Sequence, residues 1–77
     1  MMVLSELFDL VCPHGRDAER VECFLRDTKG GTICYRNAAQ HTASVAEWRA
    51  NRYGLLLAPV ESYNYDENAG LLYATLR

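Results

Sequence analysis

Residues 20–36, RVECFLRDTKGGTICYR, hold two stretches in which apolar and polar side chains alternate. Alternation with a period of two residues is typical of a strand that packs one face on a core. The two stretches, residues 20–26 and 32–36, therefore predict a β-hairpin. Their apolar faces carry Val21, Cys23, Leu25, Ile33 and Tyr35.

The length of the hairpin loop decides whether these apolar sets share one face of the sheet. An odd number of loop residues places them on the same face, whereas a two-residue Gly30-Gly31 loop would separate them. We therefore predict a three-residue loop, Lys29-Gly30-Gly31, with a glycine in the left-handed conformation that forms a bulge. The outward face then carries Arg20, Glu22, Phe24, Arg26, Thr32, Cys34 and Arg36.

A helix is predicted after the first hairpin. Ser44-Val45-Ala46-Glu47 fits a capping box, in which the Ser hydroxyl accepts from a backbone N–H and the Glu carboxylate reaches back. Gly54 follows Tyr53 and is typical of a helix C-terminal stop.

Residues 3–12 fit two structures. Their apolar residues recur at helical spacing, which indicates an amphipathic helix. The alternation between Glu6 and Cys12 would also fit a strand. We favour the helix, which Pro13 and Gly15 end.

The C-terminal part of the chain predicts a second hairpin. Residues 55–58, LLLA, form a continuous apolar run that is typical of a strand covered on both faces. Pro59 limits pairing there, and residues 61–65 extend the strand. A turn at residues 66–70, DENAG, then leads into a last strand at residues 71–76.

These elements together predict an α+β fold with a twisted antiparallel sheet of about four strands. The sheet would be built from the two hairpins, with one or two helices packed on one face. The 77-residue length predicts a single domain, residues 1–77. Apolar residues make up 49% of the chain and charged residues 23%, as is usual for folded domains.

No targeting signal or membrane span is expected. Acidic residues interrupt the N-terminal segment, which also lacks the basic start of a signal peptide. The longest apolar run, residues 55–60, is far shorter than the roughly 20 residues of a membrane helix. Three cysteines, an odd number, argue against a disulfide framework. We therefore expect a cytoplasmic protein.

Neither a metal site nor another cofactor is predicted. Cys12, His14, Cys23 and Cys34 are residue types that zinc accepts, but their spacing lacks the close ligand pairs of structural zinc sites. The hairpin register also places Cys23 inward and Cys34 outward, so the two thiols would not converge on one ion.

Catalysis is not expected either. A thiol site would combine a cysteine with His14 or His41 and an acid such as Asp17, and no local signature supports it. Asp66 and Glu67 are adjacent on a turn and solvated, which does not suit acid–base work. We predict that the chain is not an enzyme.

Binding of a larger protein is the favoured function. Residues 61–68, ESYNYDEN, predict a site of Tyr63, Tyr65, Asp66 and Glu67. Tyrosine gives a large contact area at low entropic cost, and the carboxylates suit an Arg- or Lys-rich partner. The sequence also allows the alternative of an ordinary hairpin, in which Tyr63 packs on Tyr73 across the two strands. An unpaired edge strand offers a second route to partners, including a homodimer.

By size and charge the chain is analogous to phage or mobile-element antagonists such as anti-CRISPR proteins. This analogy suggests an inhibitor or adaptor that occludes a surface of a larger complex.

Single-stranded nucleic-acid binding is the second hypothesis. Arg20, Phe24, Arg26 and Arg36 would combine cations with an aromatic ring on one sheet face, as in some single-strand binders. The net charge of −2 and the presence of Glu22 weigh against it. In the opposing interpretation, the N-terminal segment covers Phe24 and the arginines pair with nearby carboxylates.

Overall fold

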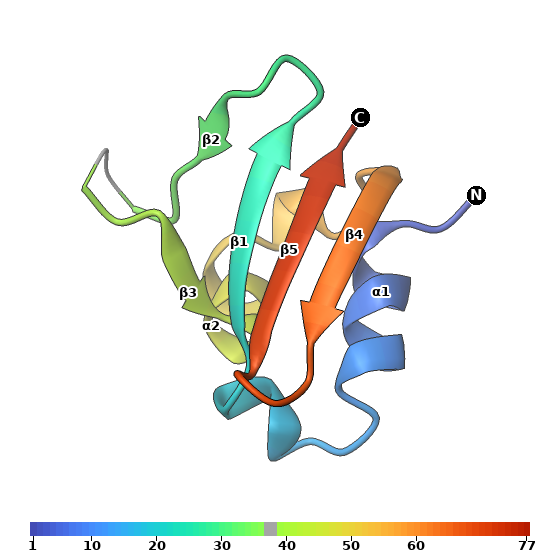
Figure 1. Ribbon diagram of the computed structural model, residues 1–77, viewed down its shortest axis with the longest axis vertical. Coiled ribbons are helices and arrows are strands. Elements are labelled where there is room, and N and C mark those ends of the chain that lie inside the picture. Colours follow the sequence, from blue (N-terminus) through green and yellow to red (C-terminus); the bar gives the residue numbers. More distant parts are fainter. Residues whose placement is uncertain (37–38) are drawn as a thin grey trace.

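The computed structural model describes residues 1–36 and 39–77. Within them, helices pack on one side of a single sheet, with every helix behind the sheet in Figure 1. The elements in chain order are α1 (Leu4–Val11), η1 (Asp17–Glu19), β1 (Glu22–Asp27), β2 (Thr32–Ile33), β3 (Thr42–Ser44), α2 (Val45–Asn51), η2 (Tyr53–Leu55), β4 (Val60–Asp66) and β5 (Leu71–Leu76).

The sheet has the strand order β2-β1-β5-β4, and β3 pairs with the same edge of β1 as β2. The α+β class and the twisted sheet with helices packed on it are confirmed. The sheet differs from the expected one in having five strands and one parallel pairing, between β1 and β5. The chain leaves β1 and crosses over through α2 before it returns, and such a crossover permits parallel neighbours.

The loop of the first hairpin lies at residues 28–30, one position earlier than predicted. The Asp27 N–H donates to the Gly31 carbonyl at 2.8 Å and closes the loop. The Asp27 carboxylate also accepts from the Lys29 and Gly31 N–H groups, at 2.9 Å each. These bonds fix where the loop begins. Gly30 has a φ of +87°, so the predicted length of three and the left-handed glycine are both present.

The predicted strand at residues 55–58 is wrong. This segment is the end of η2 followed by a turn, and β4 begins only at Val60. The Leu56 carbonyl accepts from the Ser5 N–H at 2.9 Å, and the Ala58 carbonyl accepts from the Leu4 N–H at 3.0 Å. The segment thus caps the first turn of α1, where the N-cap residue Val3 has no side chain that could accept these bonds.

Both predicted helices are present, but the stop expected at Gly54 is wrong, because α2 ends at Asn51 and Gly54 lies within η2. α1 is a helix rather than a strand, and its buried face carries Leu4, Leu7 and Phe8. In α2 the capping box is confirmed: Ser44 Oγ accepts from the Glu47 N–H, and Glu47 Oε1 accepts from the Ser44 N–H, each at 3.1 Å.

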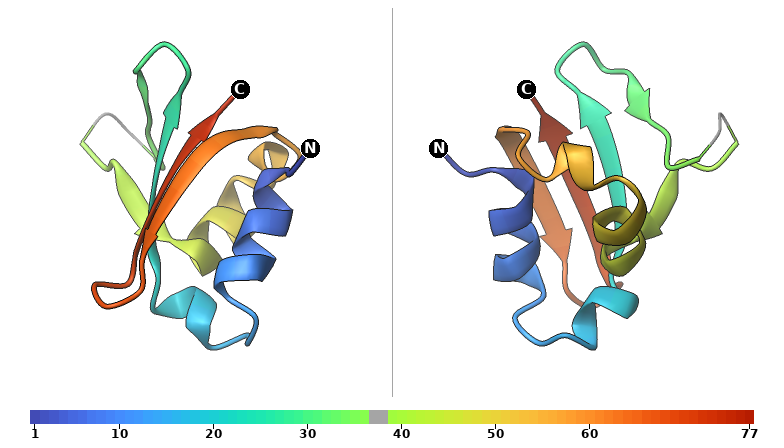
Figure 2. Two further views of the ribbon diagram at one scale, coloured as in Figure 1. Left: turned by 45° about the vertical axis from the view of Figure 1, so that its right-hand side comes forward. Right: turned by 180° about the vertical axis from the view of Figure 1, so that it is seen from behind.

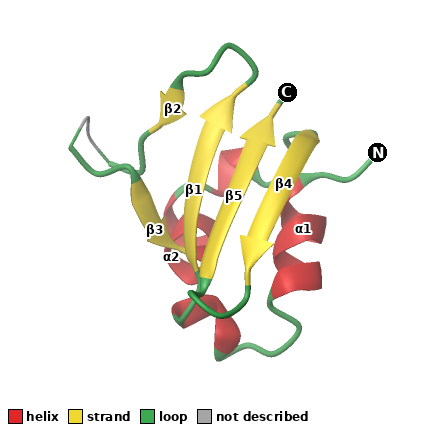
Figure 3. Cartoon of the chain, viewed as in Figure 1, coloured by secondary structure: helices red, strands yellow, loops and turns green. Residues whose placement is uncertain are grey.

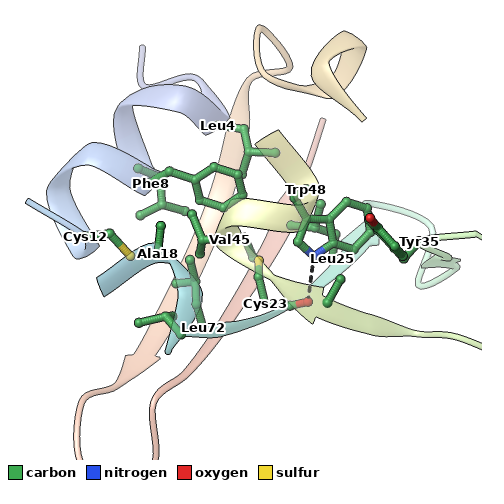
Figure 4. Close-up of a cluster of buried hydrophobic side chains, with 14 of the residues drawn as sticks. Leu4, Phe8, Cys12, Ala18, Cys23, Leu25, Tyr35, Val45, Trp48 and Leu72 are labelled. Atoms are coloured by element: carbon green, nitrogen blue, oxygen red, sulfur yellow. Dashed lines mark hydrogen bonds between the residues drawn. The ribbon is translucent and has the colours of Figure 1, made fainter. Parts of the chain in front are cut away.

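The core lies between the helices and the inner face of the sheet (Figure 4). Trp48 of α2 is completely buried, and its Nε1–H donates to the Cys23 carbonyl of β1 at 3.0 Å. The ring of Tyr35 packs edge-on against the indole, with centroids 5.3 Å apart. α2 is therefore joined to the sheet by a directed bond as well as by apolar burial.

The opposite face of the sheet has no helix over it (Figures 2 and 3). We call it the outer face. The pairing registers of β1, β5 and β4 place nine side chains on it, in three rows across the strands. The rows are Glu22, Leu71 and Asp66; Phe24, Tyr73 and Asn64; and Arg26, Thr75 and Ser62.

In the part of the chain that the structure describes, no helix has the length and apolar character needed to cross a membrane.

The capping box of α2 gives a stability prediction. Ser44→Ala removes the acceptor for the Glu47 N–H, and we expect the free energy of unfolding to fall by about 1 kcal/mol. Urea unfolding followed by circular dichroism measures the change. Ser62→Ala, on the exposed side of β4, is the control and should stay within about 0.5 kcal/mol of the parent. Equal losses in the two variants would contradict this account of the helix start.

Candidate functional site

A groove of about 620 Å³ lies between the end of α1, η1 and the β4–β5 hairpin. Tyr63, Tyr65 and Glu67 line it on the hairpin side, and Leu10 and Val11 line it on the helix side. Three of the four residues predicted for protein binding therefore meet in one concave surface.

The two tyrosines reach the groove because of the hairpin register. Tyr63 pairs with Ala74 and Tyr65 pairs with Leu72, and both partners are buried on the inner face. Directly opposed residues of an antiparallel pair share a face. Tyr73 pairs with Asn64 on the outer face, so the alternative in which Tyr63 packs on Tyr73 is wrong.

The apolar wall of the groove was not predicted. Leu10 is 57% exposed because it lies off the stripe of α1 that contacts the core. Helical periodicity could have revealed this exposed position. Positions 4, 7, 8 and 11 lie on one stripe of the helix, and position 10 lies beside that stripe. Leu10 thus adds apolar area to the wall of the groove, across from the two tyrosines.

The groove is more acidic than basic. Asp17 and Glu67 line it together with one cation, Arg20. The pKa of the Tyr65 hydroxyl is raised, first by partial burial and then by Cys12, Glu67, Asp17 and Asp66. Carboxylates raise a tyrosine pKa only where they make the local potential negative, so this end of the groove favours a cation.

Asp66 lies apart from the other three predicted residues. It pairs with Leu71 on the outer face, and its Oδ1 accepts from the Ala69 N–H at 3.1 Å. This bond is typical of an aspartate that stabilises a turn. Asp66 therefore organises the hairpin turn and does not line the groove.

β4 is the last strand of the sheet on this side. Its start is occupied, since the Val60 N–H donates to the Met2 carbonyl at 2.8 Å and Val3 forms a bridge with Pro59. From Glu61 to Asp66, the edge of β4 opposite β5 pairs with no other strand of residues 1–36 and 39–77. An unpaired strand edge beside a groove can accept an extended segment as an additional strand.

The residues predicted for nucleic-acid binding are distributed over three places. Arg20 lines the groove, whereas Phe24 and Arg26 lie on the outer face. Arg36 follows β2, and its guanidinium lies 5.3 Å from the centre of the Tyr35 ring. The prediction that three arginines surround Phe24 on one face of the sheet is therefore wrong for Arg20 and Arg36.

Phe24 is not covered by the N-terminal segment, contrary to the opposing interpretation. Its ring lies 6.1 Å from that of Tyr73, and the strand register places both residues on the outer face. Arg26 forms no ion pair within the described parts of the chain.

The cysteines do not assemble a metal site. In the two described segments, no group of three or more His, Cys, Asp or Glu side chains could hold a metal ion. Cys12 and Cys23 are buried, and Cys34 lies with its Sγ 3.9 Å from Nδ1 of His41. Asp17, the acid considered for a thiol site, lines the groove instead.

Comparison with known protein families, with curated protein sequences and with solved structures finds no match to this chain.

The buried thiol of Cys23 gives a pH prediction. Burial raises its pKa to about 12, from an ordinary value of 9.0. Above about pH 9 the unfolded chain loses this proton and the folded chain keeps it. The free energy of unfolding therefore falls as the pH rises from 9 toward 12, by up to about 1.4 kcal/mol per pH unit.

Urea unfolding across this alkaline range measures the effect. Cys23→Ala should flatten the decline relative to the parent, whereas Cys34→Ala should keep its slope. The same slope in the parent and in Cys23→Ala would contradict a proton held on the buried thiol.

Proposed function

We propose that this chain is a non-catalytic protein-binding module that holds an extended basic segment of a larger protein in the groove beside β4. One observation carries the proposal. Tyr63, Tyr65 and Glu67 share an open groove with the exposed Leu10, directly beside the unpaired edge of β4.

The binding mode follows from what the groove offers. A segment added alongside β4 would form backbone hydrogen bonds with the unpaired edge, which supply affinity that does not depend on sequence. Its alternate side chains would contact the groove, where Tyr63 and Tyr65 provide rigid aromatic area and Leu10 provides apolar area.

The charges of the groove define the partner's chemistry. Asp17 and Glu67 outnumber Arg20, and the pKa of Tyr65 is raised partly by the same carboxylates. A lysine or arginine of the partner near the Tyr65 hydroxyl would relieve this negative potential. Apolar side chains on either side of that cation would contact Leu10 and Val11.

In the cell such a module acts as an inhibitor or adaptor, because a bound partner segment is no longer accessible to other proteins. A phage or mobile-element antagonist of the anti-CRISPR kind is one form of this proposal, supported by the small size and the net charge of −2. We place its action in the cytoplasm, in keeping with the three free cysteines.

Nucleic-acid binding is supported less well. Phe24 and Tyr73 do form an aromatic pair on the outer face, with Arg26 next to them. Glu22 and Asp66 lie on the same face, and the other two predicted arginines lie elsewhere. Phosphate binding needs clustered cations, which this face does not supply.

A matched pair of tyrosines tests the groove. Tyr63 and Tyr73 are 47% and 45% exposed but lie on opposite faces of the sheet. The probe is a peptide selected on the purified protein from a random peptide library, with its affinity measured by fluorescence anisotropy. We expect Tyr63→Ala to weaken binding at least tenfold, or about 1.4 kcal/mol, and Tyr73→Ala to leave it unchanged.

Glu67→Lys should weaken the same peptide, and the selected sequences should be rich in lysine or arginine. Failure to select any peptide, or equal losses in the two tyrosine variants, would refute the groove as the binding site.

A further inference from the structure

We propose that the outer face binds a second copy of this chain, so that two sheets pack face to face about a twofold axis. The axis would run across the strands at the level of Phe24 and Tyr73. This inference goes beyond the proposed function, because it uses the face of the sheet opposite the helices.

The centre of the outer face is aromatic and lacks a cover. The Phe24 and Tyr73 rings form a tilted pair 6.1 Å apart, and Tyr73 is 45% exposed. A shallow hollow of about 310 Å³ lies over this centre, and its lining also includes Arg26, Thr75 and the β4 residues Ser62, Tyr63 and Asn64. Aromatic centres with a polar surround are typical of protein interfaces.

The charges on this face complement one another under a twofold rotation. Glu22 and Arg26 stand two residues before and two residues after Phe24, on the same side of β1. A twofold axis that crosses the strands at Phe24 reverses β1, so Glu22 of each copy faces Arg26 of the other. Two opposite-charge contacts therefore form from one pair of residues, as an isologous interface requires.

The outer-face residues of β4 and β5 are also compatible with this twofold rotation. On β4, Asp66 of one copy faces Ser62 of the other, and Asn64 faces its own equivalent. Ser hydroxyls donate to carboxylates, and two amides can exchange hydrogen bonds. On β5, Leu71 faces Thr75, and Tyr73 meets its equivalent at the axis. No like charges are opposed among these nine side chains.

Two further observations favour a second copy over another occupant. Neither Glu22 nor Arg26 has an ion-pair partner of its own within residues 1–36 and 39–77. Both signs are present on the face, which suits a self-complementary surface better than a polyanion. A standard protein–protein interface buries about 800 Å² of surface on each partner. That area corresponds to about one-sixth of the 4883 Å² accessible surface of this chain.

The test is charge exchange, read by sedimentation velocity over a range of protein concentrations. We expect the parent to form a dimer and both E22R and R26E to weaken it more than tenfold, because each single change opposes like charges twice. The double variant E22R/R26E should restore the dimer, since the exchanged charges are again opposite. Far-ultraviolet circular dichroism confirms that each variant is folded.

Leu10→Ala is the control for the groove: Leu10 lines the groove and not the hollow on the outer face, so this variant should dimerise like the parent and separates failure of the groove proposal from failure of this one. A parent that stays monomeric, or a double variant that dimerises no better than the single ones, would overturn the inference. Binding of a labelled oligothymidylate that R26E abolishes and E22R strengthens would assign the face to single-stranded nucleic acid instead.

Discussion

The bond from the Trp48 indole to the Cys23 carbonyl is the contact on which the arrangement of this small fold depends. It joins the middle of α2 to the beginning of β1, at a depth where an unpaired carbonyl or indole N–H would be costly. Tyr35 closes over the indole from the connection after β2. With α2 fixed in this way, the core forms on one side of the sheet, between the sheet and α1.

A single covered face leaves the molecule with two surfaces of different character. The outer face keeps an aromatic centre and balanced charges, whereas the groove combines tyrosines with an acidic rim and a free strand edge. β4 has no fully buried residue, so its side chains contribute little to the core and are available for contacts. The candidate binding surfaces of this chain thus lie where the small core ends.

Much of the fold could be predicted because local signals were strong. The capping box placed α2, helical spacing placed α1, and parity gave the odd hairpin loop. The strand expected at residues 55–58 failed for a tertiary reason: its carbonyls cap α1, and no local pattern shows a partner that is distant in sequence. β3 was missed because three residues are too few for a periodic signal.

The candidate groove could be predicted only in part, because composition is visible in the sequence and strand register is not. Composition identified Tyr63, Tyr65 and Glu67, but the turn bond of Asp66 and the outward position of Tyr73 depend on the hairpin register. A register that pairs Asp66 with Leu71 fixes which tyrosines share a face, and composition carries no information about it.

The position of β5 has a consequence for how the chain acquires its structure during translation. β5 lies between β1 and β4, although it follows both of them in the chain. β1, β2, β3 and both helices leave the ribosome before the strand that joins them to β4 is synthesised. Until then the edge of β1 that later pairs with β5 has no partner and is open to other chains. The sheet is therefore complete only once β5 inserts between β1 and β4, a pairing with β1 that is distant in sequence and costs loop-closure entropy.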